Sequence, residues 1–178
     1  MRKTHRIALF FSMIIVSLII ISSLYAAQQA KTYVSDKFNY SVTYPSDYGL
    51  RQLNNIIFFV SPKKDKKFSF ASNVNIMVKD LDEAAADTEK YYAQAKKRLL
   101  KSLGEVKILE EKKEKINGRQ AQKLVYTSAV NEATFKLMQV TFISGKKVYV
   151  ITYTSLLKEY DNYLKQARVI INSFKILE

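Results

Sequence analysis

Histidine and cysteine, the side chains behind much nucleophilic and metal chemistry, are missing from nearly the whole chain. The 178-residue sequence has no cysteine, and its one histidine, His5, lies in the N-terminal segment. The rest of the chain therefore has no means for Ser-His-Asp or Cys-His catalysis, for paired-cysteine redox chemistry, or for zinc and iron sites with histidine or cysteine ligands. A Ser-Lys pair or a carboxylate pair stays open, but no motif marks one, so we expect a non-enzymatic protein without a cofactor.

The densest group of acidic residues lies at 80–87, and its oxygen atoms are of the kind that binds calcium. The group consists of Asp80, Asp82, Glu83 and Asp87, and it lacks the glycine-hinged loop of a dedicated calcium site. Acidic side chains also favour the first turn of a helix, where they cap free backbone amides and face the positive end of the helix dipole. We interpret the group as the start of a helix, with a weak calcium site as the alternative.

A lysine-rich turn is the sharpest candidate contact surface, and it consists of Lys63, Lys64, Lys66 and Lys67. Such a turn is typical of a soluble loop, but it also attracts anionic lipid headgroups or wall polymers, by roughly 1 kcal/mol per lysine near an anionic membrane. The net charge of +13 favours an anionic partner, although the codon usage of an AT-rich genome would also enrich lysine. No base-stacking motif is present, so nucleic acid is not expected as a partner.

Residues 1–26 have the pattern of an export signal. Arg2, Lys3 and Arg6 precede an apolar stretch over 7–30 that has no charge. This stretch is long enough to span a bilayer, so residues 1–26 are either a cleaved signal peptide or an uncleaved signal anchor, which would then be the one membrane contact. In both cases the rest of the chain is expected outside the cytoplasm, and the lack of cysteine excludes a lipoprotein. Residues 27–35 are interpreted as a short tether.

Alternating apolar residues predict a strand at the start of the folded region. The side chains that share one face and are expected to be buried are Phe38, Tyr40, Val42 and Tyr44. Pro45 and Asp47, within Tyr44-Pro45-Ser46-Asp47, then end the strand in a turn. On this interpretation Phe38→Ala costs about 3–5 kcal/mol, whereas the alternative makes the aromatic row an exposed partner-binding strip. The apolar run 56–60 predicts a second strand that is buried on both faces.

Helix and hairpin signals fill the rest of the chain. A helix is expected over 84–103, with an apolar stripe formed by Tyr92, Ala95, Leu99 and Leu103. Asn117-Gly118 and Gly145-Lys146 predict tight hairpin turns, and apolar residues at three- and four-residue steps predict a last helix over 160–174. The strands between these helices have large apolar side chains on both faces. We therefore predict an α+β fold, a mostly antiparallel β-sheet with one long helix on each face, as an α/β/α three-layer sandwich in a single domain over 36–178.

Three stretches have family-like core and turn patterns. They are Phe38 to Tyr48, the Gly118 hairpin followed by Ala121-x-x-Leu124-x-Tyr126, and Gly145 to Tyr153 before the last helix. With these patterns residues 36–177 resemble the PsbP-like superfamily, which includes PsbP of photosystem II, DcrB-type envelope lipoproteins and a Ran-binding import factor. The resemblance implies a non-enzymatic binding, assembly or chaperone-like protein, but the fold alone does not choose its partner. The residues with a structural role in this motif set are Phe38, Tyr44, Pro45, Asp47, Gly118 and Gly145.

Two functions of different classes remain after these exclusions. The leading hypothesis is an exported, non-catalytic binding or assembly module of the cell envelope that contacts another protein. The alternative is a basic attachment protein that binds anionic lipid or cell-wall polymer through the lysine-rich turn.

Overall fold

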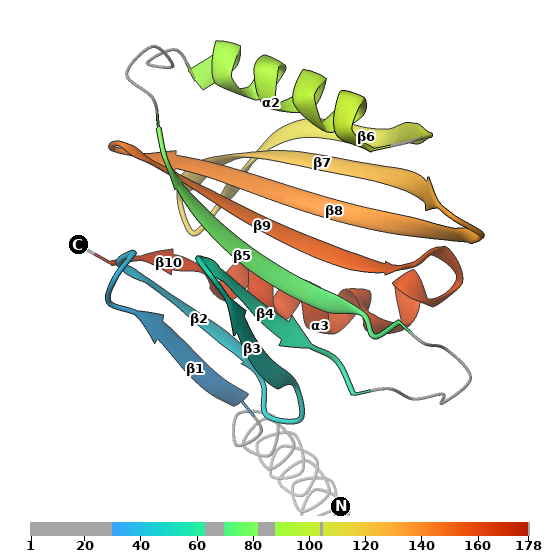
Figure 1. The fold of residues 1–178 in the computed structure, drawn as a ribbon. Helices are drawn as coiled ribbons and strands as arrows, with labels where there is room; N and C mark the ends of the chain where they lie inside the picture. The colour runs from blue at the N-terminus through green and yellow to red at the C-terminus, as the bar shows by residue number, and fades with distance from the viewer. Residues whose placement is uncertain (1–29, 63–69, 82–87, 104, 178) are drawn as a thin grey trace, which may run out of the picture.

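The computed structural model describes residues 30–62, 70–81, 88–103 and 105–177, which form two antiparallel sheets and two α-helices (Figure 1). The larger sheet has the strand order β3-β4-β5-β9-β8-β7-β6. Its strands are β3 (Gly49–Leu53), β4 (Ile56–Val60), β5 (Asn73–Asp80), β6 (Val106–Ile116), β7 (Arg119–Val130), β8 (Ala133–Ser144) and β9 (Lys147–Leu156). The smaller sheet has the order β1-β2-β10 and consists of β1 (Ala30–Ser35), β2 (Tyr40–Pro45) and β10 (Lys175–Ile176).

Tight turns with positive φ connect neighbouring strands of the seven-stranded sheet. Asn117 and Gly118 join β6 to β7 with φ angles of 49° and 77°, and Gly145 lies between β8 and β9 with φ of 55°. These conformations suit Asn and Gly, so both predicted hairpins are confirmed. The side-chain Nδ2 of Asn117 also donates to the backbone oxygens of Asn172 and Phe174, at 2.8 and 2.9 Å. The first hairpin is thereby tied to the end of the C-terminal helix, α3 (Tyr160–Ser173).

The smaller sheet corrects the predicted tether over 27–35 for residues 30–35, whereas 27–29 lie outside the described residues. Ala30–Ser35 form β1, which pairs antiparallel with the whole of β2. The alternation in this stretch is weak, because Tyr33 packs against the core whereas Val34 is 49% exposed. From its composition alone, such a weakly patterned segment cannot be told from a tether. Only its pairing with β2 shows that it is a strand.

The Tyr44-Pro45-Ser46-Asp47 motif ends β2, as predicted. Tyr40, Val42 and Tyr44 are buried on the inner face of this strand. After Pro45, the backbone N–H of Tyr48 donates to the Pro45 carbonyl oxygen at 3.1 Å and closes the turn.

Phe38 is not part of the buried row. It lies in the turn between β1 and β2, where Asn39 has a φ of 51° and interrupts the alternation. The Phe38 ring is partly buried at the margin of the core, with the Nζ atoms of Lys37 and Lys147 at 5.1 and 5.9 Å from its centroid. The loss of about 3–5 kcal/mol expected for Phe38→Ala applies to a fully buried ring, so that value no longer holds for this position.

The core lies between one face of the seven-stranded sheet and a layer made by α3 and the smaller sheet. The residues that α3 buries are Tyr160, Tyr163, Ala167, Ile170 and Ile171, as its periodicity predicts. The end of α3 is fixed on β2, since Thr43 N donates to Ser173 Oγ at 2.8 Å and Ser173 Oγ lies 3.0 Å from Thr43 O. Inside the layer the Tyr153 hydroxyl donates to the Tyr160 carbonyl oxygen at 2.7 Å.

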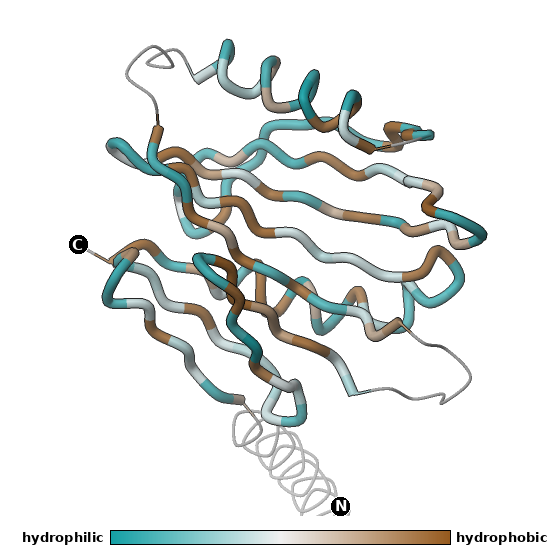
Figure 2. Tube along the Cα trace, in the orientation of Figure 1, coloured by the Kyte–Doolittle hydropathy of each residue, from teal (hydrophilic) through white to brown (hydrophobic). Residues whose placement is uncertain are grey.

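The other helix, α2 (Thr88–Ser102), lies on the opposite face at the β6–β7 end of the sheet (Figure 1). It has no buried residue, and Figure 2 shows hydrophilic colouring along much of it. Its apolar stripe is nevertheless half-buried on the sheet. The stripe consists of Tyr92, Ala95 and Leu99, together with Leu103, which directly follows the helix. The predicted α+β fold with a helix on each face is confirmed, but α2 leaves part of its face uncovered.

Candidate binding surface

One face of the seven-stranded sheet is covered by α2 at one end and open at the other. In Figure 1, α2 runs along β6 and β7, whereas β3 and β4 lie far from it. On β4 the core-facing side chains of Ile57 and Phe59 are 3% and 0% exposed, but Phe58 and Val60 on the other face are only half-buried. The prediction that the apolar run 56–60 is buried on both faces is therefore wrong for one face.

A hollow with a volume of about 480 Å³ opens on the uncovered part of the sheet, and we call it the sheet hollow. Its walls come from β3, β4, the start of β5 and the residues just before β5. The lining side chains that matter for its chemistry are Arg51, Leu53, Phe58, Val60, Phe70 and Asn73. Its volume is within the range of ligand-binding sites, roughly 300–1,000 Å³, but it is a shallow surface of a sheet rather than an enclosed cavity.

The β3–β4 hairpin builds one wall of the sheet hollow. Asn54, with a φ of 51°, turns β3 into β4, and the register places Arg51 opposite Phe58 and Leu53 opposite Ile56. Residues directly opposite in an antiparallel pair share a face of the sheet, so Arg51 and Leu53 stand beside the phenyl ring on the open face. Leu53 is 62% exposed, the highest value among the large apolar side chains of the described residues.

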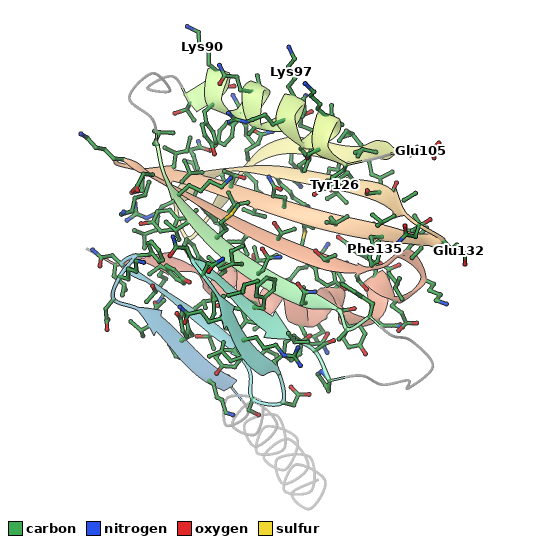
Figure 3. The ribbon with its side chains drawn as sticks, in the orientation of Figure 1. Lys90, Lys97, Glu105, Tyr126, Glu132 and Phe135 are labelled. Carbon is green, nitrogen blue, oxygen red and sulfur yellow. The ribbon has the colours of Figure 1, made fainter. Side chains whose placement is uncertain are left out.

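Two phenylalanines form another part of this apolar surface. The ring centroids of Phe70 and Phe135 are 5.0 Å apart in a T-shaped contact at 73°. Phe135 lies near the β7–β8 turn, as Figure 3 shows. Both rings remain half-buried. Covering water-exposed apolar surface with a partner is favourable by about 25 cal/mol of free energy per Å² buried. This favours a contact site here.

Arg51 supplies the charge of the sheet hollow. Of the described residues that line it, Arg51 is the one with a formal charge. None of the ion pairs formed within the described part of the chain includes Arg51. Aromatic and arginine side chains are enriched at the centres of protein interfaces, where lysine and carboxylates are depleted. The composition of this surface therefore suits binding better than acid–base catalysis.

The contacts of α2 with the sheet are polar at both sides of its apolar stripe. The Tyr92 hydroxyl donates to the Thr141 carbonyl oxygen at 3.3 Å, and Lys96 Nζ lies 2.8 Å from a carboxylate oxygen of Glu111. Burial raises the pKa of Tyr92, and the neighbouring Glu89 carboxylate adds to the rise. The helix is thus held at the edge of the sheet without closing over the sheet hollow.

A narrower groove of about 280 Å³ separates α2 from β5 and β9. Met77 and Leu99 contribute apolar walls, and Lys79 and Arg98 contribute positive charge from the strand and the helix. The outer face of α2 is solvent-exposed, and Lys90 and Lys97 point away from the sheet (Figure 3). This groove is smaller and more polar than the sheet hollow, so we place the candidate contact at the hollow.

The lysines predicted as a contact surface lie outside the described residues, so that surface stays a prediction: Lys63, Lys64, Lys66 and Lys67. The predicted export segment 1–26 also lies outside them. No helix within the described ranges is long and apolar enough to cross a bilayer. The residues Pro45, Asp47, Gly118 and Gly145 lie at a strand end or in turns and do not line the sheet hollow, and their structural role stays a prediction.

Most of the acidic group at 80–87 also lies outside the described residues. Asp80 is described; it ends β5 and its carboxylate lies 3.1 Å from Lys147 Nζ. Among the residues that the structure places, no three His, Asp or Glu side chains are arranged to hold a metal ion. The charged segment 110–115 belongs to β6, which is an edge strand of the seven-stranded sheet.

Comparison with known proteins decides the family. The sequence pattern described as PsbP-like protein matches residues 21–176, which is most of the chain. The chain belongs to the PsbP-like protein family. The predicted resemblance is thereby confirmed, whereas no curated protein matches the chain.

Solved structures show the same fold at low sequence identity. The PsbP-like chain is similar to CyanoP, the cyanobacterial PsbP of Synechocystis, with a TM-score of 0.60, 11% identity, and coverage of 83% of this chain and 92% of that one. It is also similar to LpqN of Mycobacterium tuberculosis, a protein involved in cell envelope biogenesis, with a TM-score of 0.62, 16% identity, and coverage of 84% and 91%. A Pseudomonas aeruginosa protein of unknown function gives a TM-score of 0.58, 19% identity, and coverage of 79% and 94%.

The residues of the sheet hollow were not singled out from the sequence. The apolar run that contains Phe58 predicts burial, and nothing in the run distinguishes the ring on the core face from the ring on the open face. Leu53 stands among polar residues at the end of a short strand, which gives no apolar pattern. One sequence signal could have indicated the hollow: the strands have apolar side chains on both faces, but the helix over 88–102 is polar in composition. A helix that buries no residue cannot cover a whole apolar face, so part of that face stays open to other partners.

Proposed function

We propose that this PsbP-like protein is an exported, non-catalytic binding or assembly module of the cell envelope that contacts another protein through the sheet hollow. The observation that carries the proposal is the open apolar face of β3 and β4, with Leu53 62% exposed beside Phe58 and Phe70. A fold that buries Phe59 completely on one face of β4 and leaves Phe58 half-exposed on the other has apolar surface available for a partner.

Two further observations support the proposal. The N-terminal pattern of Arg2, Lys3 and Arg6 before an apolar stretch is typical of an export signal. LpqN, which shares the fold, is described as involved in cell envelope biogenesis. A role in contacting an envelope protein is in keeping with both.

Leu53→Asp should remove partner capture without unfolding the protein. A charge at the centre of an apolar contact is expected to lower recovery of the partner at least about tenfold, whereas an exposed position should change the free energy of unfolding by no more than about 0.5 kcal/mol. The measurement is affinity capture of the tagged, full-length chain from its own cells, with quantitative identification of enriched proteins and a denaturant melt of each variant.

Leu50→Asp is the matched control. Leu50 is in the same strand and is 44% exposed, but its register partner is Phe59, so it stands on the opposite face of the sheet from Leu53. Capture of the partner should survive this change. Equal loss of capture in both variants, or no enriched envelope protein with the parent chain, would refute the sheet hollow as the contact site.

A second candidate function is electrostatic attachment to anionic lipid or wall polymer, and the net charge of +13 favours it. Changing all four lysines of the lysine-rich turn to glutamine should lower cosedimentation with anionic vesicles at least about tenfold. Raising the salt concentration should also lower cosedimentation. A control variant changes four exposed lysines elsewhere to glutamine: Lys97, Lys101, Lys107 and Lys115. Vesicle binding that is equally weakened in the control would mean that the turn has no special role.

A further inference from the structure

The two edges of the seven-stranded sheet are protected to very different degrees. The β6 edge is 11 residues long and dense in charge. Lys112 pairs with Glu110 and Glu114 along this strand at 3.0 and 3.5 Å, and Lys113 pairs with Glu89 of α2 at 2.7 Å. Charged and ion-paired side chains of this kind discourage another strand from pairing with an edge. The β6 edge is therefore a poor site for strand addition.

The β3 edge lacks the ion-paired charges that line β6, and Arg51 is its one charged residue. All five residues of β3 are exposed, and among the described residues β4 is its one neighbouring strand. An edge strand presents the N–H and C=O groups of alternate residues to solvent, so a further strand would find hydrogen-bond partners along β3. β3 also carries Arg51 and Leu53 of the sheet hollow, so the edge and the hollow form one continuous surface.

Charge selects the kind of strand that fits this edge. Arg51 is the central residue of Gly49–Leu53, so two copies of β3 that paired in register would place one Arg51 directly opposite the other. Like charges at directly opposed positions destabilise a strand pair, and the net charge of +13 adds to the repulsion between copies. A carboxylate at the same position would instead form a charge-assisted pair with the guanidinium group.

We propose that the β3 edge accepts an extended segment of the partner protein by β-strand addition, with an acidic residue opposite Arg51 and apolar residues two positions before and after it, on the same face. Side chains of the added strand that point to the face of Arg51 and Leu53 lie beside these two residues, at the β3 rim of the sheet hollow. The segment needs about five residues to match β3, and its apolar side chains extend the apolar rim of the hollow next to Leu53. This inference rests on the proposed function, since it uses the same hollow, and it names the recognition mode and the chemistry of the partner.

Reversing the charge of a synthetic peptide and that of Arg51, separately and together, tests the proposal. The probe is the end-blocked peptide valine-threonine-glutamate-threonine-valine, titrated into the full-length chain and followed by nuclear magnetic resonance shifts and amide exchange of β3. We expect protection of the β3 amides and binding about tenfold tighter than that of the same peptide with lysine at its centre. Arg51→Glu should reverse this preference, and Arg98→Glu, the same change at an exposed site on α2, should leave it unaltered.

Backbone methylation of the peptide separates strand addition from simple charge attraction. In an added strand only alternate N–H groups point to β3, so N-methylation of one alternate set should abolish binding while methylation of the other set leaves it intact. Equal effects of the two sets, or an unchanged preference in Arg51→Glu, would overturn the proposal. A dimer through β3 in the absence of peptide, detected by light scattering and amide protection, would overturn the choice of occupant. If Leu53→Asp still removes partner capture in those cases, the proposed function stands and strand addition alone fails.

Discussion

Truncation of Phe59 to alanine is expected to lower the free energy of unfolding by about 3–5 kcal/mol, which is a large share of the stability of an ordinary domain. Phe59 is 0% exposed, and its ring centroid lies 4.9 Å from that of Tyr44 and 6.0 Å from that of Tyr33. It therefore packs where the smaller sheet meets the seven-stranded sheet. Alanine would leave a cavity between the two sheets, and denaturant melts of purified protein measure the loss.

Phe58→Ala is the matched control for this prediction, because Phe58 is the same residue type in the same strand on the opposite face. A half-buried ring loses less transfer free energy and leaves no closed cavity, so the expected loss is about 1–2 kcal/mol. Equal losses from the two variants would mean that both faces of β4 are buried. That result would contradict the sheet hollow and would agree with the burial that the apolar run predicts.

The protein is expected to unfold in alkaline solution near pH 11, because burial raises the pKa of several tyrosines. Burial raises the pKa of Tyr126 to about 12 and that of Tyr160 to about 12. It also raises the pKa of Tyr40, Tyr48 and Tyr153. All five side chains are at most 7% exposed. The native state therefore holds phenol protons that the unfolded chain, with a pKa near 10, has already released.

The direction of the pH effect follows from this difference in bound protons. Their stabilising contribution is complete below pH 10 and is lost as the pH rises toward 12, since only the unfolded state ionises in that window. Each tyrosine weakens the fold by about 1.4 kcal/mol per pH unit, so five tyrosines remove about 7 kcal/mol by pH 11, which is comparable to the whole stability of many domains. Circular dichroism and the tyrosinate absorbance that comes from these five of the chain's 12 tyrosines should change together in one transition.

Tyr126→Phe tests the source of the alkaline transition. Removing one of the five phenols should reduce their joint contribution to the pH dependence of the unfolding free energy by about one fifth and should move the midpoint upward. Ionisation of all 12 tyrosines while the dichroism stays native would show that the five phenols are exposed to solvent, in contradiction to the packing of the core.

The parts of the fold that were predictable are those with strong local signals. Asn117-Gly118 and the Gly145 turn require positive φ, and the steps of three and four residues in α3 leave one interpretation for that helix. The acidic start and apolar stripe of α2 likewise placed it near its observed position. These elements form where local preference and tertiary packing agree.

The parts that were not predictable depend on which segments meet in space. Ala30–Ser35 have a weak pattern and become a strand through pairing with β2, and Phe38 leaves its expected row because Asn39 turns the chain with positive φ. The run 56–60 predicts burial on both faces, but its open face would need a cover that α2, placed along β6 and β7, does not supply. The sheet hollow arises from this geometry, so no local stretch of sequence marks it.

Site-specific photo-crosslinking in living cells tests the central claim, that one face of β3 and β4 is core and the other is the partner contact. A benzoylphenylalanine residue is placed at Leu53 in one strain and at Leu50 in another, two exposed positions of one strand on opposite faces. The account predicts that position 53 forms an adduct with one enriched envelope protein in far higher yield than position 50. Equal adduct yields at both positions, or an adduct from position 50 alone, would contradict it.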